Sequence, residues 1–548
     1  MLGWLGGTLA AYLLTSFLSN FYLGTTRFVF LGLSLTILCA VVGYGFADEA
    51  LRRLEAGWRR EWPGLLVLLL ASGLTAGALF VSTRFPSLFE TRLLFMDNAR
   101  LPFFFGLAVL SFPAAYVLVH RAHGRVLPDA ITAFVHANLP GLLLAGSFFI
   151  TYFTFAATIN FPGHRTLDEY FDMDVSAWLA RLTAPSARAV TDVIRAVHPA
   201  VMLFLRPPVW FISLFLHGDQ LRAIFLMQAL VAAACVFLTW RIVKRASGRT
   251  TYALLMATLL GASASHLLLG SMLETYIYSS LALLIFVSLL QSDRTGLTAT
   301  VPAGVLIFGI TVTNLAQATI LYFVKTLKVK VIVVFMILVV GVVLILNVVQ
   351  IRIYPAATSL IPSSLEREKS YEFDMSASSW KTIGRISLVA HAVPLYCIVA
   401  PRPYVLTTEL GTPYPNFRTF KITIGEFHIA GYSGLGNVTA KLWLLILAAA
   451  ALLFIWDFVH HPEPGLALGL VFCLGFNLAL HIIYGDDPML YSPDWVYALV
   501  LFVAFAFVRF ADKKWFQLAS IVFLAALIIV NIGLIRQIIA VSAPFYGR

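Results

Sequence analysis

Apolar segments of about 20 residues recur along almost the whole chain, and they limit the available folds more than any other feature. Each segment is long enough to cross a hydrocarbon core roughly 30 Å thick as a helix. The composition agrees, because 60% of the 548 residues are hydrophobic and only 12% are charged. Lipid offers no partners to backbone groups, and long unbroken apolar runs favour helices over barrel strands. The sequence therefore predicts an all-α fold, a polytopic membrane bundle.

The apolar pattern predicts about 13 transmembrane helices and one broken pair of short segments. The full segments are 2–19, 28–46, 64–81, 102–119, 133–158, 221–241, 251–271, 276–290, 331–350, 441–458, 465–484, 495–510 and 516–536, and the broken pair is 301–311 with 315–324. This pattern divides the chain into N-terminal helices (1–158), a core with its first outer loop at 159–220 (159–350), a loop region (351–440) and C-terminal helices (441–548).

The net charge of +11 does not indicate nucleic-acid binding, because the basic residues stand in short clusters between apolar segments. Such clusters mark cytoplasmic loops. One topology places all of them in the cytoplasm together with the N-terminus. It requires that the apolar run 198–216, interrupted by Arg206-Pro207-Pro208, lies on the surface and does not span. It also requires that the segment 301–324 enters the membrane and returns, turning near Thr313-Asn314. The loops 159–220 and 351–440 then share the extracytoplasmic face and can form a cap there.

The first of these outer loops contains an unusual acidic stretch, TLDEYFDMDVSAW, with Asp168, Glu169, Asp172 and Asp174. In a helix Asp168 and Asp172 would share one face, where their repulsion would raise one pKa. A carboxylate in such a place can act as a general base toward a hydroxyl. Asp172-Met-Asp174 also fits a short metal-binding pattern, so a divalent metal is an alternative. A simply solvated acidic loop remains a third interpretation.

Five further residues are candidates for substrate binding. His198 and Arg206 belong to the apolar surface run, where the forked guanidinium suits a phosphate and the helix can also be a plain interfacial anchor. Glu274 lies between two apolar segments, and an ionisable group at membrane depth is a functional candidate. Arg367 and Lys369 lie in the second outer loop among interleaved aromatic residues, a mixture that suits sugars and also an interface belt.

Motifs of nucleotide-driven pumps and soluble hydrolases were not found in the sequence. The order of the remaining motifs resembles the GT-C superfamily of membrane glycosyltransferases, especially its protein-mannosyltransferase and aminoarabinose-transferase branch. The resemblance rests on Asp168-Glu169-Tyr170 in the first outer loop and on His198-Pro199 before the surface run, and it covers 159–350. The family's acidic loop normally follows the first span, whereas about five spans precede it here.

The resemblance implies a polyprenyl-phosphate sugar as donor and a glycan, lipid or protein as extracytoplasmic acceptor. Asp168 would take the proton of the acceptor hydroxyl, and the sugar would transfer in one inverting displacement without a nucleotide or other cofactor. Arg206, Arg367 or Lys369 would stabilise the departing phosphate. A transporter or flippase of lipid-linked glycans, or a glycan polymerase or ligase, is the alternative. Transport requires polar residues at mid-membrane, and the sequence concentrates them at one face.

Overall fold

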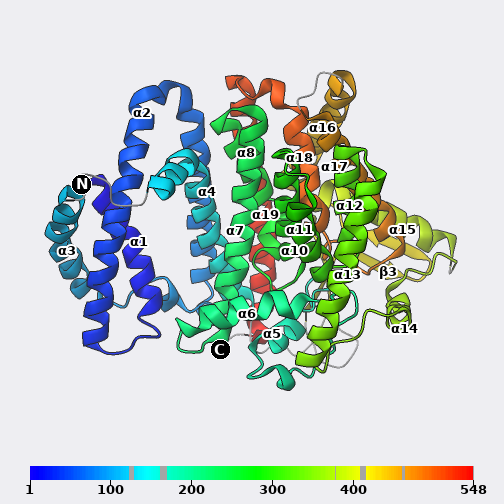
Figure 1. Cartoon of the computed structure of the whole chain (residues 1–548), viewed down its shortest axis with the longest axis horizontal. Coiled ribbons are helices and arrows are strands. Elements are labelled where there is room, and N and C mark those ends of the chain that lie inside the picture. The colour runs from blue at the N-terminus through cyan, green and yellow to red at the C-terminus, as the bar shows by residue number, and fades with distance from the viewer. Residues whose placement is uncertain (122–128, 161–168, 377, 408–414, 459–462, 547–548) are drawn as a thin grey trace.

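The structure is a computed structural model that describes residues 1–121, 129–160, 169–376, 378–407, 415–458 and 463–546. Most of it is helical, as the apolar pattern predicts (Figure 1). The all-α prediction misses two small antiparallel sheets, which pair β1 (Tyr404–Thr407) with β2 (Pro415–Arg418) and β3 (Phe420–Thr423) with β4 (Glu426–Ile429). Both belong to the polar segment 351–440, where short alternating runs replace the long apolar ones.

Nine helices in the described part of the chain are long and apolar enough to cross a membrane. They are Thr25–Arg53 and Trp62–Thr83 within α2, α3 (Leu101–Arg121), α4 (Asp129–Ile159), α7 (Gln220–Ser247), α13 (Val329–Ile353), α16 (Gly434–Asp457), α17 (Pro464–Ile483) and α19 (Lys514–Tyr546). A multi-pass membrane protein is thus supported, whereas the count of about 13 spans stays a prediction.

The remaining helices are shorter. They are α1 (Leu2–Leu18), α5 (Val175–Thr183), α6 (Val201–Leu214), α8 (Thr250–Gly261), α9 (Ala264–Leu269), α10 (Tyr276–Gln291), α11 (Leu297–Ile310), α12 (Asn314–Thr326), α14 (Pro362–Leu365), α15 (Ser379–His391) and α18 (Pro493–Ala506). The expected span 251–271 is interrupted between α8 and α9, because Ser263 caps α9 by accepting a hydrogen bond from the His266 amide at 3.2 Å. The break expected between 311 and 315 lies between α11 and α12.

The centre of the bundle is formed by α8, α10 and α18, whose residues are almost all buried, including every residue of α18. Helices farther out, such as α3 and α13, bury one stripe and expose Leu, Val and Phe on the rest. A helix that is apolar on all sides suits either a protein core or lipid. The two burial patterns therefore separate the inner helices from those that face the membrane.

The helices α5 and α6 of the first outer loop and α14 of the second polar segment lie toward one end of the bundle, called here the cap end, whereas α15 and β3 lie at the side of the bundle (Figure 1). The first outer loop and the second polar segment touch there: the Phe171 amide donates to the Phe417 carbonyl at 2.8 Å, and Ile194 bridges Ala357. Within the run 198–216, residues Val201–Leu214 form α6 at this end, and Arg206 of α6 donates to the Ala184 carbonyl. That this run lies on the surface and does not span stays a prediction. Which side of the membrane the cap end faces stays a prediction.

Candidate functional site

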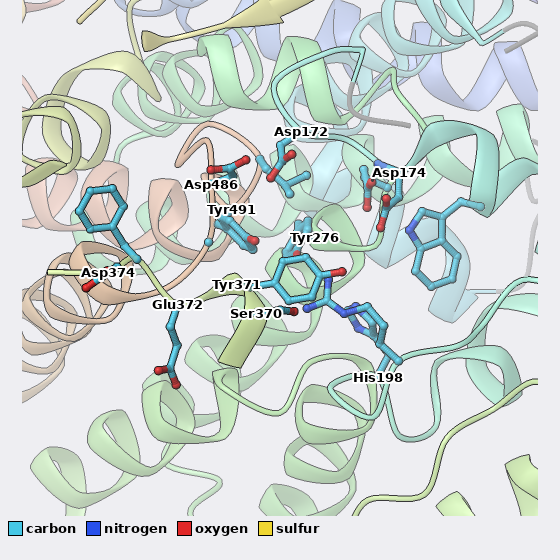
Figure 2. Close-up of a pocket in the computed structure, with 16 residues that line it drawn as sticks. Asp172, Asp174, His198, Tyr276, Ser370, Tyr371, Glu372, Asp374, Asp486 and Tyr491 are labelled. Carbon is cyan, nitrogen blue, oxygen red and sulfur yellow. Dashed lines mark hydrogen bonds between the residues drawn. The ribbon is translucent and has the colours of Figure 1, made fainter. Parts of the chain in front are cut away.

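A cavity of about 400 Å³ opens at the cap end, between the two polar segments and the helix ends below them (Figure 2). Its walls come from five stretches of chain. The lining residues include Asp172, Asp174, Arg195, His198, Glu274, Tyr276, Tyr371, Asp486 and Tyr491. The volume falls within the range of small-molecule sites, and carboxylates, aromatic rings and a guanidinium share the wall.

The acidic stretch reaches the cavity in an irregular conformation. Phe171 and Asp172 have φ of 52° and 70°, a left-handed conformation that is costly for residues other than glycine. Hydrogen bonds to β2 hold it there: the Phe171 amide donates to the Phe417 carbonyl, and the Phe417 amide donates to the Glu169 carbonyl, both at 2.8 Å. The prediction of a helix through Asp172 is therefore wrong, because the residue is left-handed and α5 begins only at Val175. Asp168 itself lies outside the described residues.

Asp172 is neutralised by an arginine from the second polar segment. Arg418 Nη1 lies 3.0 Å from Asp172 Oδ1 and 3.6 Å from Asp486 Oδ2. The neighbouring Thr419 is fixed by the buried Asp487, which accepts from the Thr419 amide at 2.6 Å and from its hydroxyl at 2.7 Å. Asp487 thus anchors the end of β2, so that Arg418 is presented to the acidic stretch.

Asp174 and Glu274 form a second, more buried acidic pair. Glu274 Oε1 accepts a hydrogen bond from the Asp174 amide at 2.5 Å, and Oε2 accepts one from the Thr275 amide at 3.1 Å. Burial, together with the nearby Asp174 charge, raises the pKa of Glu274 to about 8. Burial also raises the pKa of Asp174, although Arg181 and Arg195 act against it. A carboxylate with a raised pKa is a stronger base, and both of these face the cavity.

Arg195 is the cation of the cavity wall, and the sequence analysis missed it. Its guanidinium pairs with Glu368, donates to the Tyr484 hydroxyl at 2.8 Å and lies 3.8 Å from the centre of the Tyr371 ring. Burial lowers its pKa, but the hydrogen bond to Glu368 and the neighbouring acidic groups together outweigh burial and raise the pKa, so the group stays charged. A single Arg in a loop has no sequence spacing that marks it as a site residue. The one available hint was its position in the same outer loop as the acidic stretch.

His198 lines the cavity in a neutral form. Its Nδ1 lies 2.7 Å from the Ile310 carbonyl oxygen, at the tip between α11 and α12, and burial lowers its pKa to about 3. The Trp178 ring packs edge-on against it at 5.8 Å. His198 therefore joins the first outer loop to the α11–α12 tip and offers the cavity an uncharged imidazole.

Four other predicted residues lie outside the cavity lining. Glu169 is buried and accepts a hydrogen bond from the Tyr546 hydroxyl. Arg206 donates to the Ala184 carbonyl at 2.5 Å, beside the Tyr354 ring. Arg367 and Lys369 are exposed. The structure therefore brings Asp172, Asp174, His198 and Glu274 of the predicted set to the cavity wall. The cations found there are Arg195, which lines the cavity, and Arg418, which pairs with Asp172, in place of Arg206, Arg367 and Lys369.

The metal alternative at Asp172 and Asp174 stays a prediction, and one of these two carboxylates is already paired with an arginine. Within the described ranges, His, Cys, Asp and Glu do not gather in threes in a way that would hold a metal ion. The Arg418 guanidinium already occupies one oxygen of Asp172. A divalent cation there would have to compete with that charge.

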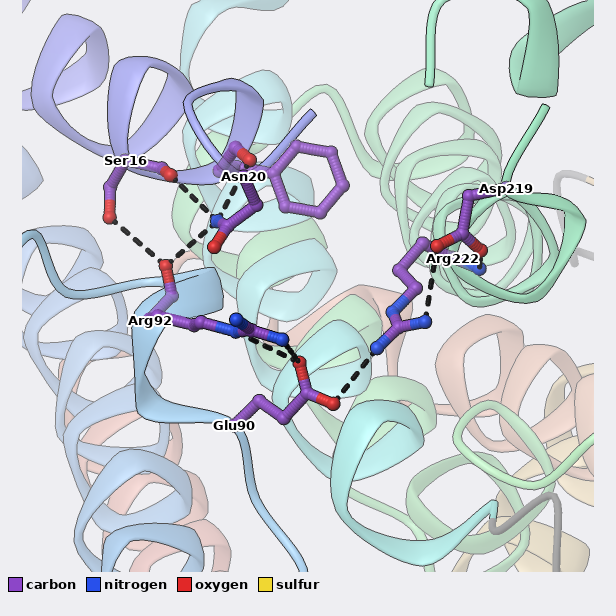
Figure 3. Close-up of polar contacts among 7 residues, drawn as sticks. Ser16, Asn20, Glu90, Arg92, Asp219 and Arg222 are labelled. Carbon is purple, nitrogen blue, oxygen red and sulfur yellow. Dashed lines mark hydrogen bonds and ion pairs between the residues drawn. The ribbon is translucent and has the colours of Figure 1, made fainter. Parts of the chain in front are cut away.

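The N-terminal helices are tied to the core away from the cavity (Figure 3). Arg222, at the start of α7, pairs with Glu90 at 2.9 Å and with Asp219 at 3.1 Å. Glu90 also pairs with Arg92 at 3.2 Å, and the Arg92 carbonyl accepts from the Asn20 side chain at 3.0 Å. This network fixes α1 and the segment before α3 to the first helix of the core.

Comparisons with protein-family models, with curated proteins and with solved structures find no match for this chain.

Proposed function

We propose that this protein is a membrane glycosyltransferase that moves a sugar from a polyprenyl-phosphate donor to an acceptor hydroxyl at the cap end. One observation carries the proposal: the Asp174–Glu274 pair and the charged Arg195 line the same cavity. A base and a cation in one partly closed space suit a displacement that releases a proton at one atom and negative charge at another.

The aromatic walls favour a sugar as the group that moves. Tyr276, Tyr371 and Tyr491 line the cavity, and Figure 2 shows them between the aspartates and His198. Tyrosine rings present apolar faces to the C–H surface of a sugar, and their hydroxyls can bond to its oxygens. The polar lining disfavours a purely apolar ligand.

In the proposed reaction the acceptor oxygen attacks the anomeric carbon while the bond from that carbon to the phosphate oxygen breaks. The electron pair of that bond leaves with polyprenyl phosphate, whose charge Arg195 stabilises. The acceptor proton passes to a carboxylate, and among the described carboxylates Asp174 is our choice. Asp172 is the weaker choice, because Arg418 already engages one of its carboxylate oxygens. Asp168 stays an alternative base.

The surface of α6 suits the lipid part of such a donor. Trp210, Phe211, Leu214 and Phe215 are all more than half exposed on this helix, which directly follows the cavity residue His198. An apolar helix face of this kind lies at the boundary between lipid and water. A polyprenyl chain can therefore rest along α6 while its phosphate reaches the cavity.

One observation favours transport of lipid-linked glycans as the second candidate. A buried series of hydrogen bonds joins α12 to α18. It runs from Asp494 through Asn314 and Gln317 to Tyr497, with successive distances of 2.8, 2.7 and 3.0 Å. An ionisable residue inside such a bundle is typical of ion-coupled carriers. The series begins three residues from Tyr491 of the cavity wall.

Turnover tests the two candidates directly. Purified protein is incubated with a panel of polyprenyl-phosphate sugars and an acceptor extract, and released polyprenyl phosphate is measured. Release that disappears in Asp174→Asn supports the transferase. Absence of release from every donor, combined with movement of a labelled donor between the leaflets of proteoliposomes, would replace it with the transporter.

A further inference from the structure

A second polar pocket, of about 270 Å³, lies at the end of the bundle opposite the cap end. It is bounded by the C-terminal end of α7, the start of α8 and the start of α19, and Figure 1 places α8 toward this end. Its lining includes three cationic side chains, Lys244, Arg249 and Lys514, and one carboxylate, Asp512. Asp512 also pairs with Lys513 at 3.6 Å, which offsets its charge. The pocket is therefore cationic.

The burial of these cations distinguishes them from their neighbours. Lys244, Arg249 and Lys514 are partly buried, whereas Arg241 and Lys513 on the same elements are exposed. Lys244 is held in place, because its Nζ donates to the Thr250 hydroxyl at 2.7 Å and to the Gly248 carbonyl at 3.1 Å. A lysine in a solvated basic loop does not need protein hydrogen bonds of this kind, since its exposed ammonium group stays fully hydrated.

Two helices begin at this pocket, and their dipoles add to its positive potential. Neither α8 nor α19 has an acidic residue in its first turn, and no side chain caps the start of α8. Helix N-termini of this kind favour phosphate oxygens. Gln517, which is 4% exposed, also lines the pocket, and its Oε1 has no partner within the described residues. That oxygen can accept a hydrogen bond from a hydroxyl on the ligand.

We propose that this pocket binds a phosphate group that carries a hydroxyl, either as an anionic lipid headgroup or on a free solute. Its position favours the lipid, because tryptophans flank it. Lys514 Nζ lies 5.9 Å from the centre of the Trp62 ring, and the next residue, Trp515, is 62% exposed. Tryptophans of this kind are enriched at the level of lipid headgroups. The proposal is independent of the reaction at the cap end.

The test is the thermal unfolding midpoint of the full-length protein in nonionic detergent. It is titrated with dioctanoyl phosphatidylglycerol, with dioctanoyl phosphatidylcholine and with inorganic phosphate, each against sodium chloride of matched ionic strength. We expect the midpoint to rise with phosphatidylglycerol, because a ligand that binds only the folded state stabilises it. In Lys244→Gln/Lys514→Gln, the half-maximal rise should require at least about tenfold more lipid. This is the loss of lipid affinity expected when one or more charge-assisted hydrogen bonds are removed.

Arg241→Gln/Arg245→Gln is the matched control, since it removes the same charge from exposed residues of α7 that do not line the pocket, and it should keep the wild-type response. A rise with phosphatidylglycerol alone assigns the pocket to lipid, and an equal rise with inorganic phosphate assigns it to free phosphate groups. An equal rise with phosphatidylcholine, an equal response in the two double variants, or no rise with any ligand would overturn the proposal. If the first double variant fails to fold, Arg249→Gln takes its place with the same criteria.

Discussion

Replacing Asp174 by Asn tests the chemistry assigned to the cavity. The amide is nearly the same size as the carboxylate and cannot take up a proton at neutral pH. The substitution should leave the local backbone unchanged, because the Asp174 amide is held by Glu274 and the Asp174 side chain does not cap α5. We therefore expect loss of the base with little loss of structure.

The magnitude follows from the environment of this carboxyl. A positioned general base typically contributes about 10²–10⁴ in rate, so turnover should fall by that factor, or about 3–5 kcal/mol in activation free energy. Stability should change by less than about 1 kcal/mol, since burial already disfavours the charged form and its raised pKa reports this. Loss of activity and retention of stability should thus appear together.

The assay is release of polyprenyl phosphate as a function of pH, combined with the thermal unfolding midpoint. Wild-type turnover should fall as the pH drops through the raised pKa of Asp174, because only the deprotonated form accepts a proton. Glu426→Gln, an exposed carboxylate on β4, is the matched control and should behave as wild type. Turnover of Asp174→Asn within about tenfold of wild type would refute the assignment, and loss in Asp168→Asn instead would transfer the role to Asp168.

Three other predictions address the pH response, the N-terminal helices and the topology. The Glu274 carboxyl has a pKa of about 8 in the folded protein and about 4.5 in the unfolded chain, so wild-type stability should fall as the pH rises from 4.5 to 8. Glu274→Gln should flatten this pH dependence of the unfolding midpoint. Arg222→Gln breaks a partly buried pair with Glu90 and should cost about 1–3 kcal/mol, with a smaller added loss when Glu90→Gln is combined with it in a double-mutant cycle of unfolding free energies. An impermeant thiol reagent applied to intact cells should label Ser186→Cys, exposed at the cap end, and not Lys513→Cys; the reverse would invert the topology.

The helical membrane fold could be read from the chain because its signal is local. An apolar run of about 20 residues has few alternatives once lipid excludes unpaired backbone groups. Most expected segments match observed helices, including the interruption between α11 and α12. The count of spans was harder, because α8, α10 and α18 are apolar on every side and lie inside the bundle. Hydropathy alone does not distinguish a protein interior from lipid.

The candidate site could be read only in part. The sequence itself determined that acidic residues cluster in one polar loop and that His198 and Glu274 interrupt apolar surroundings. Tertiary structure alone decided that Asp174 rests on Glu274, 100 residues later, that Asp172 meets Arg418, and that Arg195 replaces Arg367 and Lys369 at the wall. The physical reason is that these pairings depend on how two polar segments close over the helix ends, and no periodicity in either segment records the position of the other.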